Sequence, residues 1–239
     1  MTSASDELTA TPGRPRGPEL ADGSRTARKR TAITDAATEL FLRHGYLGTS
    51  MDQIAALAAV SKPTVYKHFP DKEQLFTEIV LGALDRAGNP FRAELAALAE
   101  TSQLEQDLPQ AAARYLATVM QPLVLQLRRV VIGASHQLPE LARAYYDSAP
   151  DQTIRALAEC FARLAARGLL TADDPDVAAA HFAFLVLGRA LDKSLFCGDQ
   201  PFSPAELAAQ ASAGASAFLA AYARQPGQQR EPRQPREAG

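Results

Sequence analysis

The amino-acid sequence predicts an all-α protein in which a small N-terminal domain of three helices precedes a larger C-terminal helical domain. Throughout residues 25–224, apolar residues recur at the three- and four-residue spacing of amphipathic helices, and Gly, Pro and short polar residues separate the segments. Residues 1–24 and 225–239 lack this pattern, so we expect a disordered arm and a disordered tail. The expected domains are residues 25–80 and 81–224.

Composition is that of an ordinary globular protein. Of the 239 residues, 46% are apolar and 22% are charged, and no run approaches the roughly 18 apolar residues that a membrane-spanning helix needs. The polar N-terminus lacks the apolar core of a signal peptide. We therefore expect a cytoplasmic protein with no membrane partner.

Charge is distributed unevenly along the chain. Residues 25–72 contain eight Lys or Arg and four Asp or Glu, a net charge of +4, whereas residues 73–239 contain 15 and 19, a net charge of −4. A basic N-terminal segment joined to an acidic remainder indicates that only the N-terminal part faces a polyanion.

Three short helices are predicted in the N-terminal domain. The first spans residues 25–44 and ends at Gly45, and the second starts at Met51 after a capping box formed by Thr49 and Asp52. Both are amphipathic, so each buries one face in a shared core.

The third predicted helix follows a short turn. Ser61 caps it, Pro63 stands in its first turn, where a missing amide costs little, and Pro70 ends it. Two helices joined by such a turn form a helix-turn-helix, whose second helix lies in the DNA major groove. Between Ser61 and Pro70 the chain has no acidic residue and gathers hydroxyls, cations and an imidazole, which are groups that hydrogen-bond to phosphate.

Residues 49–76 read TSMDQIAALAAVSKPTVYKHFPDKEQLF and follow an amphipathic helix that ends in HGY. This segment, with its Tyr66-x-His68-Phe69 signature, resembles the DNA-binding domain of the TetR family of bacterial transcriptional regulators. One position departs from the family pattern, because Ala59 stands in the turn where the family usually has Gly. If that position requires a left-handed backbone, Ala costs about 1 kcal/mol relative to Gly.

The resemblance implies contacts to the DNA backbone by Thr49, Tyr66, His68 and Lys72. We expect base reading from Lys62, Thr64 and Lys67, because Lys donates to guanine and the Thr methyl packs on thymine. Lys67 has a second interpretation as a phosphate contact. The remaining residues expected at the DNA surface are Ser61, Pro63 and Arg28.

The N-terminal arm contains the sequence GRPRG, which is similar to the core of minor-groove AT-hooks. Arg14 and Arg16 are therefore candidates for the narrow minor groove of A·T tracts. The alternative is a solvated linker rich in Pro and Arg.

The larger domain is predicted to be a helical bundle. Its helices span about residues 72–86, 89–101, 107–120, 122–136, 139–148, 151–168, 175–197 and 204–224. Residues 128–150 resemble the regulatory domain of the AefR-like branch of the same family. In that family the last two helices pair with their copies in a homodimer; packing within one chain is the alternative explanation for their many Ala residues.

Large residues on the middle helices are candidates to line a cavity for a small hydrophobic or amphipathic effector, with ordinary core packing as the alternative. They are Tyr115, Met120, Phe161, His181, Phe184 and Leu185.

The function that these patterns and the resemblance imply is that of a sequence-specific DNA-binding regulator. We expect a repressor that binds a palindromic operator as a homodimer and is released by an effector. The alternatives are a transcriptional activator, or a nucleoid-associated or cell-cycle factor of the same fold. The sequence has no phosphate-binding Gly-rich loop, no nucleophile elbow and no Cys or His cluster with metal-ligand spacing, so we expect neither catalysis nor a metal or cofactor.

Overall fold

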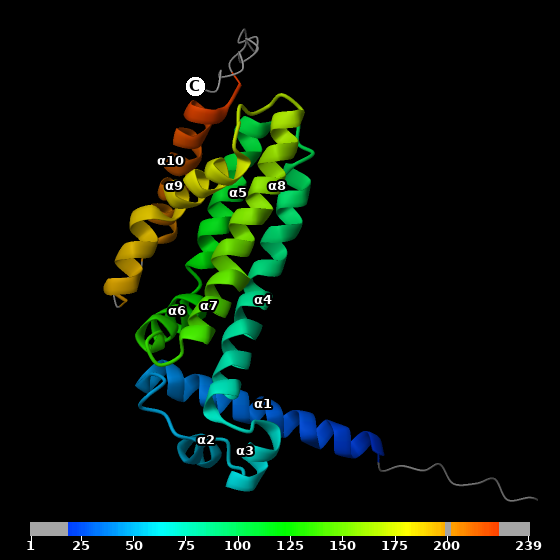
Figure 1. Ribbon diagram of the computed structural model, residues 1–239, viewed down its shortest axis with the longest axis vertical. Coiled ribbons are helices and arrows are strands. Elements are labelled where there is room, and N and C mark those ends of the chain that lie inside the picture. The colour runs from blue at the N-terminus through cyan, green and yellow to red at the C-terminus, as the bar shows by residue number, and fades with distance from the viewer. Residues whose placement is uncertain (1–18, 199–201, 225–239) are drawn as a thin grey trace, which may run out of the picture.

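The computed structural model describes residues 19–198 and 202–224, and Figure 1 shows that they form an elongated helical molecule. In these two ranges there is no β-strand, and two extended residues, Leu170 and Ala223, form an isolated bridge. The expected all-α fold class is confirmed. None of the described helices combines the length and the apolar character that crossing a bilayer requires.

The N-terminal unit consists of α1 (Glu19–His44), α2 (Met51–Leu57) and α3 (Lys62–His68). Because α1 begins at Glu19 rather than Arg25, the expected disorder of residues 19–24 is wrong. The helix opens with Glu, Leu and Ala, which are good helix formers. The rest of the arm, residues 1–18, and the tail lie outside the described residues.

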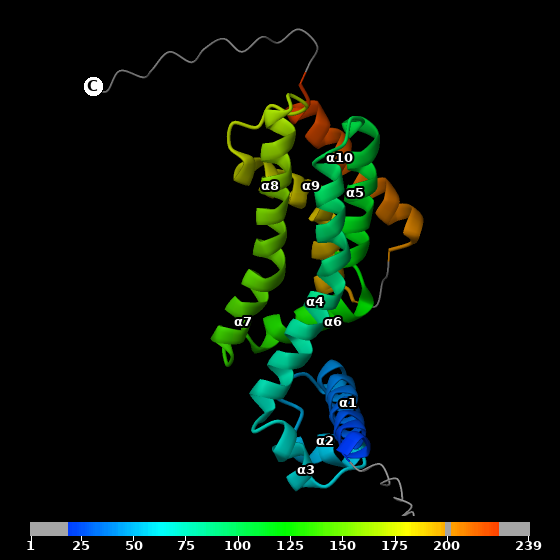
Figure 2. The same cartoon turned by 90° about the vertical axis from the view of Figure 1, so that its right-hand side faces the viewer.

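A single long helix, α4 (Lys72–Leu98), stands where two helices were expected. Pro90 lies inside it without ending it. The reason is tertiary packing: Phe91 and Leu95, which follow the proline, are buried in the core of the larger domain, and this burial outweighs the missing N–H. As Figures 1 and 2 show, α4 runs from the N-terminal unit into the bundle.

The larger domain continues with α5 (Leu104–Val119), α6 (Pro122–Ala134), α7 (Pro139–Tyr146), the short π-helix η1 (Asp147–Asp151), α8 (Gln152–Ala166), α9 (Pro175–Phe196) and α10 (Pro204–Tyr222). The break expected between residues 148 and 151 is absent, because η1 joins α7 directly to α8. A π-helical turn interrupts the α-helical hydrogen bonding locally, so it accommodates Pro150, which has no N–H to donate.

The helix α9 is bent at Gly188, whose φ of +23° only glycine adopts readily. The Gln210 side chain of α10 donates to the carbonyls of Leu185 (3.3 Å) and Val186 (3.4 Å) just before the bend. Close by, a Cβ on Gly214 would lie 2.7 Å from the Leu185 carbonyl oxygen. The last two helices therefore approach closely within one chain, and glycines make this possible.

Two hydrophobic cores hold the molecule together. The bundle core includes Phe161 and Phe218, whose ring centroids lie 4.8 Å apart. The other core belongs to the reading head, by which we mean α1, α2, α3 and the first turns of α4. There, Phe41 of α1 and Val65 of α3 belong to the same buried cluster as Leu127 of α6. Thus α6, which the sequence assigns to the larger domain, shares the core of the reading head.

Candidate functional site

The helix α3 presents an outward face of the kind that the sequence predicts. Val65 (0% exposed) and Phe69 (2% exposed) anchor it in the core of the reading head. The exposed side chains are those of Lys62, Pro63, Tyr66 and Lys67, and Thr64 and His68 are partly buried beside them. Because α3 contains no acidic residue, this outer face is basic and polar.

Ser61 caps α3, as predicted. Its hydroxyl accepts from the Thr64 N–H at 3.4 Å and lies 2.8 Å from the Thr64 hydroxyl. The next residue, Lys62, forms an ion pair with Asp52 of α2, with 2.8 Å between Nζ and Oδ1. The hydrogen bond to Asp52 raises the pKa of Lys62. Since both side chains are exposed, this pair contributes little to stability, and Lys62 can exchange Asp52 for an acceptor on DNA.

The turn between α2 and α3 requires a left-handed residue, and that residue is Ala59, with φ of +52°. Two hydrogen bonds close the turn: the Val60 N–H donates to Ala55 at 3.1 Å and the Ala59 N–H donates to Ala56 at 3.2 Å. This is the Schellman pattern, in which glycine is the usual left-handed residue. Ala59 therefore has the left-handed backbone, and we expect it to cost about 1 kcal/mol in stability relative to Gly.

Thr49 is buried, which corrects two expectations about it. Its side chain is 2% exposed and its hydroxyl donates to the Gly45 carbonyl at 2.9 Å, so it does not face DNA. Ser50 caps α2 instead, and the Gln53 side-chain oxygen accepts from the Ser50 N–H at 2.8 Å. The capping box is displaced by one residue. Asp52 therefore takes no part in it, and the Asp52 carboxylate pairs with Lys62 of α3.

Lys72 has a structural role that the sequence does not reveal. Its ammonium donates to the carbonyls of Tyr46 (2.9 Å) and Thr49 (2.8 Å) and lies 4.3 Å from the centroid of the Tyr46 ring. Partial burial lowers the pKa of Lys72. The side chain fastens the loop between α1 and α2 to the start of α4. An ammonium has three N–H donors, so a phosphate contact by the third stays a prediction.

Arg30 is a second cation with a structural role that the sequence does not indicate. Its guanidinium lies 4.4 Å from the Phe69 ring centroid, pairs with Glu78 of α4 and donates to the His68 carbonyl at 3.3 Å. These contacts tie α1 to the end of α3. Burial, and next the charge of Arg30, lower the pKa of His68, so its imidazole is neutral at pH 7.

The remaining predicted DNA contacts belong to the arm and α1. Arg28 is exposed on α1. Arg14 and Arg16 lie outside the described residues, so the minor-groove hypothesis stays a prediction.

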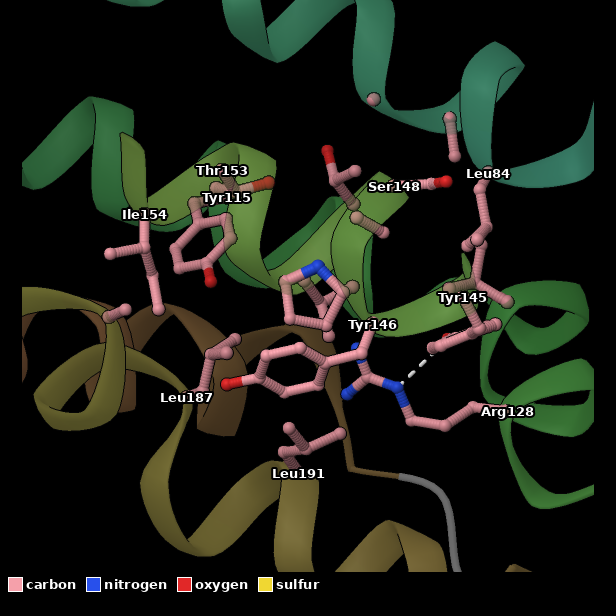
Figure 3. Close-up of a pocket in the computed structure, with 18 of the residues that line it drawn as sticks. Leu84, Tyr115, Arg128, Tyr145, Tyr146, Ser148, Thr153, Ile154, Leu187 and Leu191 are labelled. Atoms are coloured by element: carbon pink, nitrogen blue, oxygen red, sulfur yellow. Dashed lines mark hydrogen bonds between the residues drawn. The ribbon is translucent and has the colours of Figure 1, made fainter. Parts of the chain in front are cut away.

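The larger domain contains a cavity of about 370 Å³. Side chains from α4, α5, α6, α7, η1, α8 and α9 converge on it, and Figure 3 shows many of them. Most of its wall is apolar, including Leu84, Phe91, Ile154, Leu187 and Leu191. A mainly apolar cavity of this size with a few polar groups is typical of small-molecule sites.

Two of the six predicted cavity residues, Tyr115 and Phe184, line this cavity. The other four, which are Met120, Phe161, His181 and Leu185, do not line it. Phe161 is fully buried in the bundle core, and Met120 packs against that core. Leu185 is exposed, and the His181 Nδ1 atom lies 2.6 Å from the Tyr222 hydroxyl. Helical spacing identifies inward positions but does not show which of them border a void.

Arg128 and Tyr145 are cavity residues that sequence reasoning missed. The Arg128 Nε atom donates to the Tyr145 hydroxyl at 2.9 Å, as the dashed line in Figure 3 shows. Burial raises the pKa of Tyr145, and it raises the pKa of Tyr115 to about 12. Both phenols are therefore neutral at pH 7. The only available signal was that Arg128 and Tyr145 lie in the AefR-like stretch, because their convergence depends on how α6 and α7 pack.

The helix α6 connects the cavity with the reading head. Arg128 and Val131 line the cavity, whereas the neighbouring Leu127 is buried in the core shared with α1 and α3. The Arg129 guanidinium donates to the Ser194 carbonyl of α9 at 2.8 Å. A displacement of α6 would therefore change contacts both in the reading head and with α9.

Two family models match the chain. One, described as bacterial regulatory proteins of the tetR family, matches residues 33–79. The other, described as the AefR-like transcriptional repressor C-terminal domain, matches residues 66–224.

Solved structures agree with these matches. A TetR-family transcriptional regulator from Mesorhizobium loti is 40% identical, with a TM-score of 0.76, and the match covers 83% of this chain and 98% of that one. The flavonoid-responsive regulator FrrA is 32% identical, with a TM-score of 0.65, covering 84% of this chain and 100% of that one.

Among curated proteins, the transcriptional regulator RutR of Escherichia coli is 38% identical over 93 residues, which is 35% of this chain and 44% of RutR. The chain spans less than half the length of the first curated relatives that it matches. The model of the C-terminal domain, however, matches more than half of this chain. The chain therefore belongs to the TetR family of DNA-binding transcriptional regulators and has an AefR-like C-terminal domain.

Proposed function

We propose that this protein is a repressor that binds a palindromic operator as a homodimer and releases it when a small amphipathic molecule occupies the cavity. The observation that carries the proposal is the shared helix α6. It lines the cavity on one side and packs in the core of the reading head on the other. Occupancy of the cavity can therefore change the position of α3.

The outer face of α3 supports a division of labour on DNA. Tyr66 is exposed, and His68 is partly exposed at the end of the helix, where both can contact phosphate. Lys62 and Thr64 stand in the first turn, which enters the major groove first in a helix-turn-helix. We expect the first pair to set affinity on any duplex and the second pair to set sequence preference.

Exposed apolar side chains on α9 support the homodimer. Val177 (46% exposed), Phe184 (70%) and Phe196 (83%) are large, apolar and solvent-exposed, and a second copy packed against α9 would remove them from water. A single helix-turn-helix reads few base pairs, so two copies about one helical turn apart are needed for useful affinity.

Release by an effector follows from differential affinity. If the ligand binds better to a conformation in which α6 holds the two reading heads at the wrong spacing, it shifts the population away from the DNA-bound form. The flavonoid-responsive relative is consistent with a cavity for aromatic molecules. Repression follows because a compact dimer on a promoter blocks polymerase sterically.

The test is a selection of bound duplexes from a random pool by the purified full chain, followed by a reporter assay in cells. We expect a palindromic consensus and increased reporter output when the gene is deleted. Decreased output would identify an activator, and many dispersed chromosomal sites without a consensus would identify a nucleoid factor. Selected sites without twofold symmetry would contradict the homodimeric operator complex.

A further inference from the structure

The cavity contains positive charge that no acidic side chain of its own wall balances. Arg92 and Arg128 line it, and among the described residues of its lining there is no Asp or Glu. Arg92 is balanced from outside the lining, because its guanidinium lies 3.4 Å from the Asp85 carboxylate and also bonds to Gln152. Within the described structure, the one hydrogen-bond partner of Arg128 is the hydroxyl of Tyr145.

The two buried tyrosines of the cavity, Tyr115 and Tyr145, do not supply the missing anion. Burial holds the pKa values of Tyr115 and Tyr145 above the ordinary value for a phenol, so both are neutral at physiological pH. Arg128 is partly buried, and most of the groups around it are apolar. A guanidinium in such a place remains protonated and lacks a counter-charge, which is costly unless an anion joins it.

Resting on the effector function proposed above, we propose that the effector is an organic acid: an apolar, largely aromatic body that carries one anionic group, which binds the Arg128 guanidinium. Figure 3 shows how the cavity fits this description. In that view the Arg128 head group points toward the middle of the labelled residues, whereas Ile154, Leu187 and Leu191 lie to one side of it. The acid group faces α6 and the apolar body faces α8 and α9.

The hydrogen bond from Arg128 to Tyr145 strengthens this assignment. It uses the Nε atom, so the two terminal nitrogens of the guanidinium are available for a carboxylate or sulfonate. The same bond links the ligand to α7 and to the core of the reading head, in which Tyr145 is buried. An acid on Arg128 would therefore act at the junction between the cavity and the DNA-binding unit.

The experiment uses two fluorescent probes of nearly the same shape: anilinonaphthalene sulfonate, which is anionic, and N-phenylnaphthylamine, which is neutral. Each is titrated into the full-length protein and into Arg128→Met, Arg128→Lys and Arg143→Met. Arg143 is the matched control, because it pairs with Glu140 on the surface of α7 and does not line the cavity. Competition between the two probes on the wild type checks that they share one site.

We expect Arg128→Met to lower the affinity for the sulfonate probe about tenfold and to leave the affinity for the neutral probe nearly unchanged. Arg128→Lys should retain most of the sulfonate affinity, and Arg143→Met should retain all of it. Equal losses for both probes, or an unchanged sulfonate affinity in Arg128→Met, would overturn the inference.

Two further outcomes separate this inference from the proposed function. If the neutral probe binds the wild type and Arg128→Met has no selective effect, the effector site stands and the organic acid does not. If neither probe binds the wild type, the effector site itself is refuted. Should Arg128→Met fail to fold, displacement of the neutral probe from the wild type by naphthoate and by naphthamide replaces it; equal displacement overturns the inference, and stronger displacement by naphthoate supports it.

Discussion

Lys62 on the reading head and Arg128 in the cavity are both cations that we place against an anion, yet their surroundings differ. Lys62 is exposed and pairs with Asp52 at 2.8 Å. Arg128 is partly buried, and the described lining around it has no acidic residue. Water and salt screen the first charge much more than the second. We therefore expect the single cation in the cavity to contribute more to the binding of an anion than a single cation on the surface does.

The two regions also differ in how they are assembled. The outer face of α3 comes from one helix of seven residues, whereas the cavity wall comes from seven helical elements. A surface of this kind distributes its affinity over many weak contacts, so the loss of one leaves the others in place. A cavity depends on the packing of all its walls.

A substitution in the bundle core should give the largest effect on stability. Phe161→Ala removes a fully buried ring that packs against Phe182 and Phe218, so we expect the free energy of unfolding to fall by about 3–5 kcal/mol in chemical denaturation. The folded protein should still bind the neutral fluorescent probe, because Phe161 does not line the cavity. Lost probe affinity at unchanged stability would instead place this ring at the ligand.

On the reading head, Lys72→Met should have the next largest effect. The substitution removes two charge-assisted hydrogen bonds to the carbonyls of Tyr46 and Thr49, so we expect a loss of about 1–3 kcal/mol in the free energy of unfolding without DNA. Chemical denaturation of the DNA-free protein measures it. Unchanged stability combined with weaker DNA binding would mean that Lys72 acts only on phosphate.

Substitutions on the outer face of α3 should separate affinity from specificity. We expect Tyr66→Phe to weaken binding to every duplex by a similar factor, because we propose that the phenol donates to a phosphate. Thr64→Ala should change the preference at one half-site position by about tenfold or less. Binding titrations on the selected operator and on a random duplex measure both. Uniform losses for both variants would contradict the division of labour on α3.

The turn before α3 should give the smallest change. Ala59→Gly relieves a left-handed backbone at a residue with a side chain, so we expect stability to rise by about 1 kcal/mol. The measurement is the thermal unfolding midpoint of the free protein, with Ala58→Gly as the control. Ala58 has ordinary helical angles, so its replacement should lower the midpoint. A lower midpoint for Ala59→Gly would show that the turn is not strained.

Much of the reading head could be predicted from the sequence because its signals are local. Ser61, Pro63 and Pro70 mark the limits of α3, and Val65 and Phe69 mark its buried face at a spacing of four residues. The errors there concern tertiary contacts. Neither the burial of Thr49 nor the hydrogen bonds of the Lys72 ammonium can be inferred from neighbouring residues, because both depend on how the loop after α1 packs against α4.

The cavity could be predicted only as a class of site. Tyr115 and Phe184 were identified because they are large apolar or aromatic residues at helical spacing, and Phe161 satisfies the same criterion although it is plain core. Arg128 could not be identified in this way, since an arginine in a helical pattern ordinarily indicates a solvated face. Only the packing of α6 against α4 and α7 places it at a cavity.

The most direct test of the central claim is the stoichiometry of the complex between the purified protein and a labelled duplex that carries the selected palindrome, measured by sedimentation at micromolar concentration and low salt. We predict two chains per duplex, and dissociation of the complex when an organic acid that fits the cavity is added. A protein that sediments as a single chain and leaves the duplex unbound even at low salt would contradict the account.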